Sequence, residues 1–268
     1  MGFTSLLYPG ETIIDDGTPS ADKVPVGQGR GLILPMSHNP EGGNYGDLAD
    51  GFPPDLLISE SDIEGWIKEK EERQNRISDE LIRRNVPCKD QNGTNYCWIN
   101  APVFCTEVVR MFQNEAHVEL SPASVGCKIK NFKNQGGWGE EGLRYIVEHG
   151  VVPVNLWPAN AISRQYDKPE YWTAAEAYKV TEWTELRPRN MQQIASLVLR
   201  NIPVAVGYNW WSHEVTVVDA VWLDGTLAIR IRNSWGMGWG DKGFGILKGN
   251  KMLADDAVAP RVSMAQAA

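Results

Sequence analysis

The chain has 268 residues, of which 42% are hydrophobic, and its formal net charge is −8. This length fits one large domain or two small ones, and the hydrophobic fraction is enough for a substantial core. The acidic balance and the absence of a Lys/Arg cluster argue against nucleic acid and anionic membranes as partners. No apolar run reaches the roughly 18 residues that a membrane-spanning helix needs.

The first residues, MGFTSLLYPGETIIDDG, lack the basic region and the apolar stretch of a secretory signal peptide. The cysteines are too few and too irregularly spaced for a disulfide scaffold or a zinc site. We therefore expect no cofactor and no metal. The expected location is the cytoplasm or a large particle assembled inside the cell.

Residues 1–58 hold seven of the 16 prolines and ten of the 26 glycines. Such a composition does not sustain long helices, so it predicts an extended arm with short strands such as RGLILPM. An arm of this kind can reach for protein neighbours.

Residues 59–85 follow with the pattern of a surface helix. Acidic residues fill its first turn and arginines its end, which suits the helix dipole. Two apolar clusters, around Trp66 and around Leu81, flank a charged middle. We expect these ends to pack on the domain or on a neighbouring subunit.

Residues 86–252 have an α+β pattern, and residues 253–268 are expected to be a loose tail. Helical spacing runs from Cys97 to about Gln113, from Gly139 to His149 and from Asn190 to Arg200. Four apolar or alternating stretches predict strands: IPVAVGYNW, HEVTVVDAVWL, LAIRIRNSW and GFGILKG.

Cys97, His213 and Asn233 are the candidate catalytic residues. A cysteine that opens a helix has its thiolate favoured by the positive end of the helix dipole. Of the four histidines, only His213 opens a valine-rich strand, and Asn233 follows it by 20 residues. The asparagine carbonyl can orient the imidazole, and Trp235 can shield that hydrogen bond from water.

Four segments together resemble the papain-family cysteine peptidases, in the same order. They are KDQNGTNYCW, NQGGWGEEGLRYIVEHGVVP, SHEVTVVDAV and IRNSWGMGWGDKGFGIL, and the resemblance covers roughly residues 86–248. It implies a papain-like fold of two halves, with a helical left half, an antiparallel β right half and a cleft between them.

The resemblance also implies a role for each site residue. Cys97 is the nucleophile, His213 the general base and acid, Asn233 the orienting group and Gln91 an oxyanion donor. The substrate-binding positions are Gly136, Gly137, Trp138, Trp235 and Glu214. The glycines stand where an extended peptide pairs with bare backbone, which implies that the substrate is a peptide or a protein.

Several positions depart from the family pattern. The separation between Cys97 and His213 is short, which predicts a trimmed second half. The disulfide beside the family's active site would join the positions of Thr94 and Asn134, and neither is a cysteine here. Glu214 replaces a small residue, so we expect a bias toward basic or polar substrate side chains near the scissile bond.

Each assignment has an alternative reading. Cys97 could be a buried structural thiol, as we expect for Cys88, Cys105 and Cys127. The whole chain could be a structural or interaction subunit of a larger assembly, or an amidase or transferase that uses the same residues. We expect residues 1 to about 85 to stay attached rather than act as a removable inhibitory pro-segment.

Overall fold

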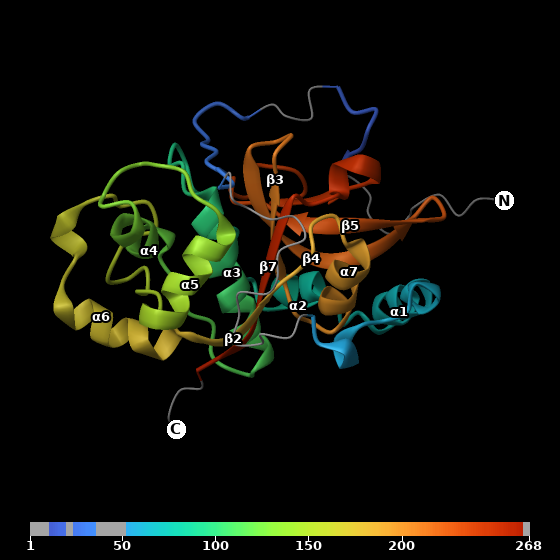
Figure 1. The fold of residues 1–268 in the computed structure, drawn as a ribbon, viewed down its shortest axis with the longest axis horizontal. Helices are drawn as coiled ribbons and strands as arrows, with labels where there is room; N and C mark the ends of the chain where they lie inside the picture. The colour runs from blue at the N-terminus through green and yellow to red at the C-terminus, as the bar shows by residue number, and fades with distance from the viewer. Residues whose placement is uncertain (1–10, 20–23, 36–51, 265–268) are drawn as a thin grey trace.

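The computed structural model describes residues 11–19, 24–35 and 52–264. One end of the molecule is a cluster of helices, and the other is a large sheet covered by further helices (Figure 1). This arrangement confirms the predicted α+β class. The helices are α1 (Glu60–Arg73), α2 (Ile77–Arg83), α3 (Cys97–Phe112), α4 (Pro122–Ile129), α5 (Gly139–His149), α6 (Pro169–Ala175) and α7 (Met191–Leu199).

Seven strands form a single mixed sheet, in the order β1-β6-β5-β4-β3-β7-β2. Among the strand pairs of the described residues, β1–β6 is parallel and the others are antiparallel. The strands are β1 (Thr12–Ile14), β2 (Val180–Glu185), β3 (Val204–Tyr208), β4 (His213–Leu223), β5 (Thr226–Arg232), β6 (Phe244–Leu247) and β7 (Asp256–Ser263).

Helix α3 lies between two hydrophobic clusters and belongs to both. Phe104 and Val108 pack with the sheet, α1, α2 and α7. Trp98 and Val103, on another face, pack with α4, α5 and Trp157. Because nearly every side chain of α3 is buried, the helix fixes the position of its first residue, Cys97. The helix continues through Pro102.

The prediction of one surface helix over residues 59–85 is wrong in one respect, because the segment forms α1 and α2. Gln74, between them, adopts a left-handed conformation with φ 49°. Asp79 caps the second helix, since its carboxylate accepts the backbone N–H of Arg76 at 3.0 Å. The charged stretch between the two apolar clusters has no apolar face to pack on the core, so packing does not stabilise one continuous helix there.

The prediction of a loose tail from residue 253 is also wrong. Residues 256–263 form β7, which lies between β3 and β2 inside the sheet. The strand carries Pro260, which cannot donate a ladder hydrogen bond and so weakens the sequence pattern of a strand. The described part of the chain contains no helix with both the length and the apolar character to cross a membrane.

Candidate active site

Cys97 opens α3 and is completely buried. Burial is the largest influence on its thiol, and together with nearby Glu214 it raises the pKa to about 12. Backbone N–H groups of Glu214, Gly31 and Trp98 oppose that rise by donating toward the sulfur. The thiol is therefore protonated at neutral pH in this conformation.

His213 begins β4, and its ring is held by Asn233. The Nε2 atom of His213 lies 2.8 Å from Oδ1 of Asn233. The same Oδ1 accepts the backbone N–H of Ser234 at 2.8 Å, which fixes the amide with its oxygen toward the histidine. Since an amide oxygen only accepts, His213 carries its proton on Nε2, and Nδ1 is left as the basic nitrogen.

The environment of His213 keeps the neutral ring. Trp235 stacks on it with ring centroids 4.4 Å apart. Burial lowers the pKa of His213 to about 3, the Asn233 hydrogen bond raises it, and the charge of Arg30 lowers it further. The Nδ1 atom has no hydrogen-bond partner within the described residues. Buried polar atoms usually have a hydrogen-bond partner, so the unpartnered Nδ1 is free to accept a proton.

Gln91 stands six residues before Cys97, and three hydrogen bonds hold its side chain. Its Oε1 accepts the hydroxyl of Ser234 at 2.6 Å. Its Nε2 donates to the carbonyl oxygens of Thr94 at 2.8 Å and Gly29 at 3.0 Å. The indole N–H of Trp235 donates to the same Gly29 oxygen at 3.1 Å. These two side chains therefore form a ready pair of donors for a carbonyl oxygen.

Gly29 belongs to the N-terminal arm, and residues 29–33 of this arm run across the site. The backbone N–H of Gly137 donates to the carbonyl oxygen of Gly31 at 2.9 Å. In return, the backbone N–H of Ile33 donates to the carbonyl oxygen of Gly137 at 2.9 Å. Leu32 donates to the carbonyl of Ser212 at 3.3 Å, beside His213. The arm thus helps to cover Cys97, because the backbone N–H of Gly31 is directed at its sulfur.

The glycines of the arm are required by this close approach. A β-carbon on Gly29 would lie 2.0 Å from the carbonyl oxygen of Thr94, and one on Gly31 would lie 2.1 Å from that of Asn95. Gly136 faces the arm in the same way, with the Gly31 oxygen 2.3 Å from where its β-carbon would be. Only residues without a side chain fit here.

The remaining predicted substrate-binding positions differ in their contact with the arm. Gly137 pairs with the arm, whereas Trp138 precedes α5 and has no hydrogen bond to the arm among the described residues. Glu214 follows His213 and is buried, and the backbone N–H of Gly139 is directed at its carboxylate. At the place of the family's disulfide, the side chain of Asn134 accepts the N–H of Asn95 at 2.6 Å.

The four cysteines are all free. Burial raises the pKa of the Cys88 and Cys127 thiols, as it does for Cys105. Sequence reasoning missed the site residues Gly29, Gly31, Leu32, Ser212 and Ser234. The alternating glycines of the arm, at positions 27, 29 and 31, were the one available signal for close backbone approach.

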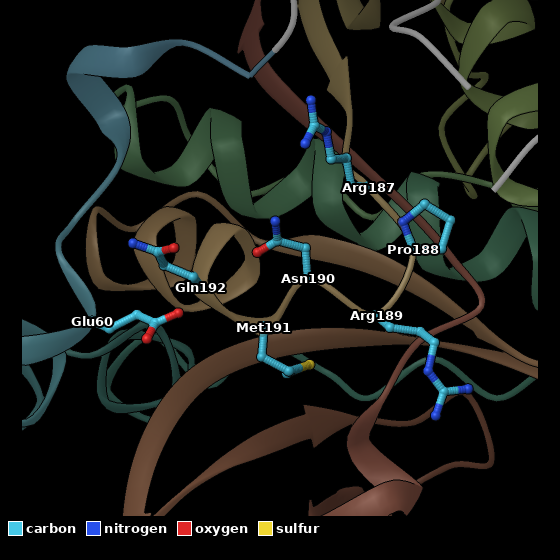
Figure 2. A pocket seen from close by; sticks show the side chains of 7 residues that line it. All are labelled: Glu60, Arg187, Pro188, Arg189, Asn190, Met191 and Gln192. Atoms are coloured by element: carbon cyan, nitrogen blue, oxygen red, sulfur yellow. The ribbon is translucent and has the colours of Figure 1, made fainter. Parts of the chain in front are cut away.

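A separate surface hollow of about 770 Å³ is lined by none of these residues. It lies at the start of α7, and Figure 2 shows that the guanidinium groups of Arg187 and Arg189 point away from each other. The two cations therefore do not converge on a common anion, and the hollow does not compete with the Cys97 site as the centre of the chemistry.

A family profile and two curated relatives agree in what this chain is similar to. The profile described as "Papain family cysteine protease" matches residues 79–217. Chymopapain of Carica papaya is 27% identical over 189 residues, which are 61% of this chain and 51% of chymopapain. Cathepsin K of Mus musculus is 24% identical over 207 residues, which are 67% of this chain and 62% of the relative.

Solved structures share the fold. Digestive procathepsin L2 proteinase of the Tenebrio molitor larval midgut superposes with a TM-score of 0.57 at 18% identity, over 69% of this chain and 67% of the other. The ragweed pollen allergen Amb a 11, a cysteine protease in its proform, superposes with a TM-score of 0.57 at 20% identity, over 68% and 64%. The chain spans between a half and two thirds of the length of the first curated relatives that it matches.

Proposed function

Because the chain belongs to the papain family of cysteine proteases, we propose that it hydrolyses peptide bonds with Cys97 as the nucleophile. The observation that carries this proposal is the hydrogen bond between His213 Nε2 and Asn233 Oδ1, which leaves Nδ1 as a base. A buried, oriented and neutral histidine is what a thiol needs to lose its proton at the moment of attack.

In the proposed reaction, Nδ1 of His213 takes the thiol proton and the Cys97 sulfur bonds to the substrate carbonyl carbon. The electron pair of the C=O bond moves to oxygen, which accepts hydrogen bonds from Gln91 and from the backbone N–H of Cys97. His213 then gives its proton to the leaving amine as the C–N bond breaks. Finally, His213 deprotonates a water that attacks the thioester, which releases the acid and restores the thiol.

The arm has to leave before a substrate enters. It does not itself lie as a substrate, because it presents the N–H of Gly31 to the Cys97 sulfur rather than a carbonyl carbon. Its Gly29 oxygen also occupies the donors of Gln91 and Trp235. We therefore propose a latent peptidase whose cleft opens when residues 29–33 move away.

The filled cleft also favours a second candidate, an interaction subunit whose papain-like domain stays closed. An amidase or transferase with the same catalytic residues is the third. The Gly31→Ala variant separates these possibilities, because a methyl group at position 31 collides with the Asn95 backbone and expels the arm.

The experiment measures cleavage of a mixed fluorogenic peptide set and iodoacetamide labelling of each cysteine. We expect Gly31→Ala to label at Cys97 and to cleave peptides, and the Gly31→Ala/Cys97→Ala double variant to do neither. Rapid labelling at Cys97 without any peptide cleavage would favour the amidase or transferase. An inert thiol in the expelled-arm variant would favour the closed interaction subunit.

A further inference from the structure

The side chain of Asn134 ties the loop before Cys97 to the segment before Gly136. Oδ1 of Asn134 accepts the backbone N–H of Asn95 at 2.6 Å, and Nδ2 of Asn134 donates to the carbonyl oxygen of Gly93 at 3.2 Å. In return, the side-chain amide of Asn95 donates to the backbone carbonyl oxygen of Asn134 at 3.2 Å. We call these three hydrogen bonds the Asn134 clasp.

Both ends of the Asn134 clasp carry groups of the proposed reaction. One end is the oxyanion loop, residues 91–95, which begins with Gln91 and leads to the backbone N–H of Cys97. At the other end, Asn134 stands three residues before Gly137, whose backbone N–H and carbonyl oxygen both pair with the arm. The clasp therefore holds the proposed oxyanion donors in a fixed position relative to the backbone that would pair with a peptide.

The Asn134 clasp lies where the family pattern has a disulfide, at the positions of Thr94 and Asn134. Asn134 is exposed and Asn95 is half-buried, so water competes for the three hydrogen bonds of the clasp. A disulfide opens only by a chemical reaction, whereas these bonds open and close by local fluctuation. The oxyanion loop of this chain therefore depends on every other contact that supports it.

The arm is such a support while it lies in the cleft. The backbone N–H of Gly29 donates to the carbonyl oxygen of Asn92 at 2.7 Å. The carbonyl oxygen of Gly29 accepts Nε2 of Gln91 at 3.0 Å. When the arm leaves, the oxyanion loop loses both bonds at once and depends more strongly on the Asn134 clasp.

We propose that Asn134 is a positioning residue that keeps the oxyanion loop in place once the arm has left the cleft. This inference rests on the proposed peptidase function. With the arm docked, the bonds of Gly29 hold the loop even without the clasp. With the arm displaced, loss of the clasp lets the loop open, and Gln91 and the backbone N–H of Cys97 no longer converge on one oxygen. Because the arm and the clasp support the same loop, the effects of removing them are not additive.

The first test needs no catalysis. In the full chain with Cys97→Ala, NMR follows hydrogen exchange at two amides of the oxyanion loop. The Gln91 N–H is bonded to the Ser234 carbonyl oxygen at 2.8 Å, and the Thr94 N–H to the Gln91 carbonyl oxygen at 3.1 Å. Neither bond includes the arm or Asn134, so both amides report opening of the loop itself.

We expect Asn134→Ala to accelerate this exchange by less than about threefold while the arm is docked, and by at least about tenfold when Gly31→Ala has expelled it. Loss of protection at the Ile33 amide, which is bonded to the Gly137 oxygen, verifies that the arm has left. Where Ile33 stays protected, Gly29→Ala/Gly31→Ala takes the place of Gly31→Ala.

Gln135→Ala is the matched control. Gln135 adjoins Asn134 and binds the indole N–H of Trp98 through its backbone carbonyl oxygen, which alanine keeps. It should leave exchange unchanged in both states. An Asn134→Ala effect that is no larger with the arm expelled than with the arm docked would overturn the proposal. That outcome leaves the peptidase function standing, since the measurement is made without the nucleophile.

The second test measures peptide cleavage in the Gly31→Ala chain with Cys97 intact. We expect Asn134→Ala to lower kcat by about tenfold and to change KM by less than about twofold, because the oxyanion exists only after the peptide has bound. Gln135→Ala should change neither. An unchanged kcat, with or without a rise in KM, would overturn the proposal. Cleavage of no peptide by Gly31→Ala itself would count against the peptidase function and leave the exchange test to decide the role of Asn134.

Discussion

Gly31 and Asn95 approach so closely that a β-carbon on Gly31 would lie 2.1 Å from the Asn95 carbonyl oxygen. That oxygen belongs to the loop just before Cys97, and real β-carbons do not come so near to backbone oxygens. The contact therefore makes residue 31, like residue 29, a position of the arm with no space for a side chain, and it provides a way to open the cleft without touching any catalytic side chain.

We predict that Gly31→Ala accelerates alkylation of Cys97 by at least about tenfold, the equivalent of about 1.4 kcal/mol of lost arm binding. The physical reason is steric, since the added methyl group has no space. Iodoacetamide labelling followed by peptide mapping measures the rate for each of the four thiols. Gly65→Ala, where nothing lies within 4 Å of an added β-carbon, is the control and should label as slowly as the original chain.

Trp235→Phe should loosen the arm less than Gly31→Ala does. A smaller aromatic ring remains at the position that stacks on His213, but the indole N–H that donates to the Gly29 oxygen at 3.1 Å is lost. One hydrogen bond contributes about 1 kcal/mol, so labelling of Cys97 should rise about fivefold. Trp239→Phe alters the same aromatic cluster at a ring that makes no hydrogen bond to the arm in the described structure. A Trp239→Phe effect as large as that of Trp235→Phe would show that packing, and not the hydrogen bond, holds the arm.

The local patterns of the sequence predicted the elements that carry the catalytic candidates. Helix α5 has the predicted bounds, and β4 matches the stretch HEVTVVDAVWL, because strong periodicity and clear end residues coincide there. The spacing of Cys97, His213 and Asn233 was readable because each stands at the end of such an element. The hydrogen bond that joins His213 and Asn233 is consistent with their predicted roles.

The docking of the arm could not be read from the sequence in the same way. It depends on backbone contacts of Gly31, Leu32 and Ile33 with residues more than a hundred positions later, and such contacts leave no periodic trace. Likewise, Glu214 alternates along β4 with valines on the opposite face of the sheet. Which of the two faces carries Glu214 is known only from the register of β4 with Gly207 of β3. Strand β7 was missed because its proline contradicts a strand assignment.

The loop that carries Gln91 should depend on a buried ion pair. Lys89 and Glu107 of α3 are 4% and 3% exposed, and Nζ lies 2.6 Å from Oε1. The backbone of Leu120 bonds to both side chains. We predict that Lys89→Met lowers the free energy of unfolding by about 3–5 kcal/mol, because it removes the lysine cation from the buried Glu107 carboxylate and leaves it only the Leu120 N–H and the longer 3.4 Å contact with His117.

The double variant Lys89→Met/Glu107→Gln should recover part of that loss, since no unpaired charge remains. Urea unfolding followed by tryptophan fluorescence measures both. Lys68→Met, which removes an exposed ion pair with Glu64, is the control and should change the free energy by less than about 1 kcal/mol. A Lys89→Met loss no larger than this control would show that the buried pair does not hold the loop.

Stability should fall as the pH rises through the neutral range, and Glu185 on β2 is one cause. Burial first, and then the charges of Glu140 and Asp256, raise the pKa of Glu185 to about 8, while Arg144 opposes the rise. An unfolded glutamate releases its proton near pH 4.5, whereas the folded one keeps it until about pH 8. Between these values the folded state binds one more proton, so the free energy of unfolding decreases by up to about 1.4 kcal/mol per pH unit.

Glu185→Gln should flatten this slope and be more stable than the original chain at pH 8. Glu182→Gln, on the same strand and paired with Arg261 at the surface, is the control and should leave the slope unchanged. Urea unfolding at pH 5, 6, 7 and 8 measures the slope, and equal slopes in Glu185→Gln and the original chain would mean that Glu185 ionises normally in the fold.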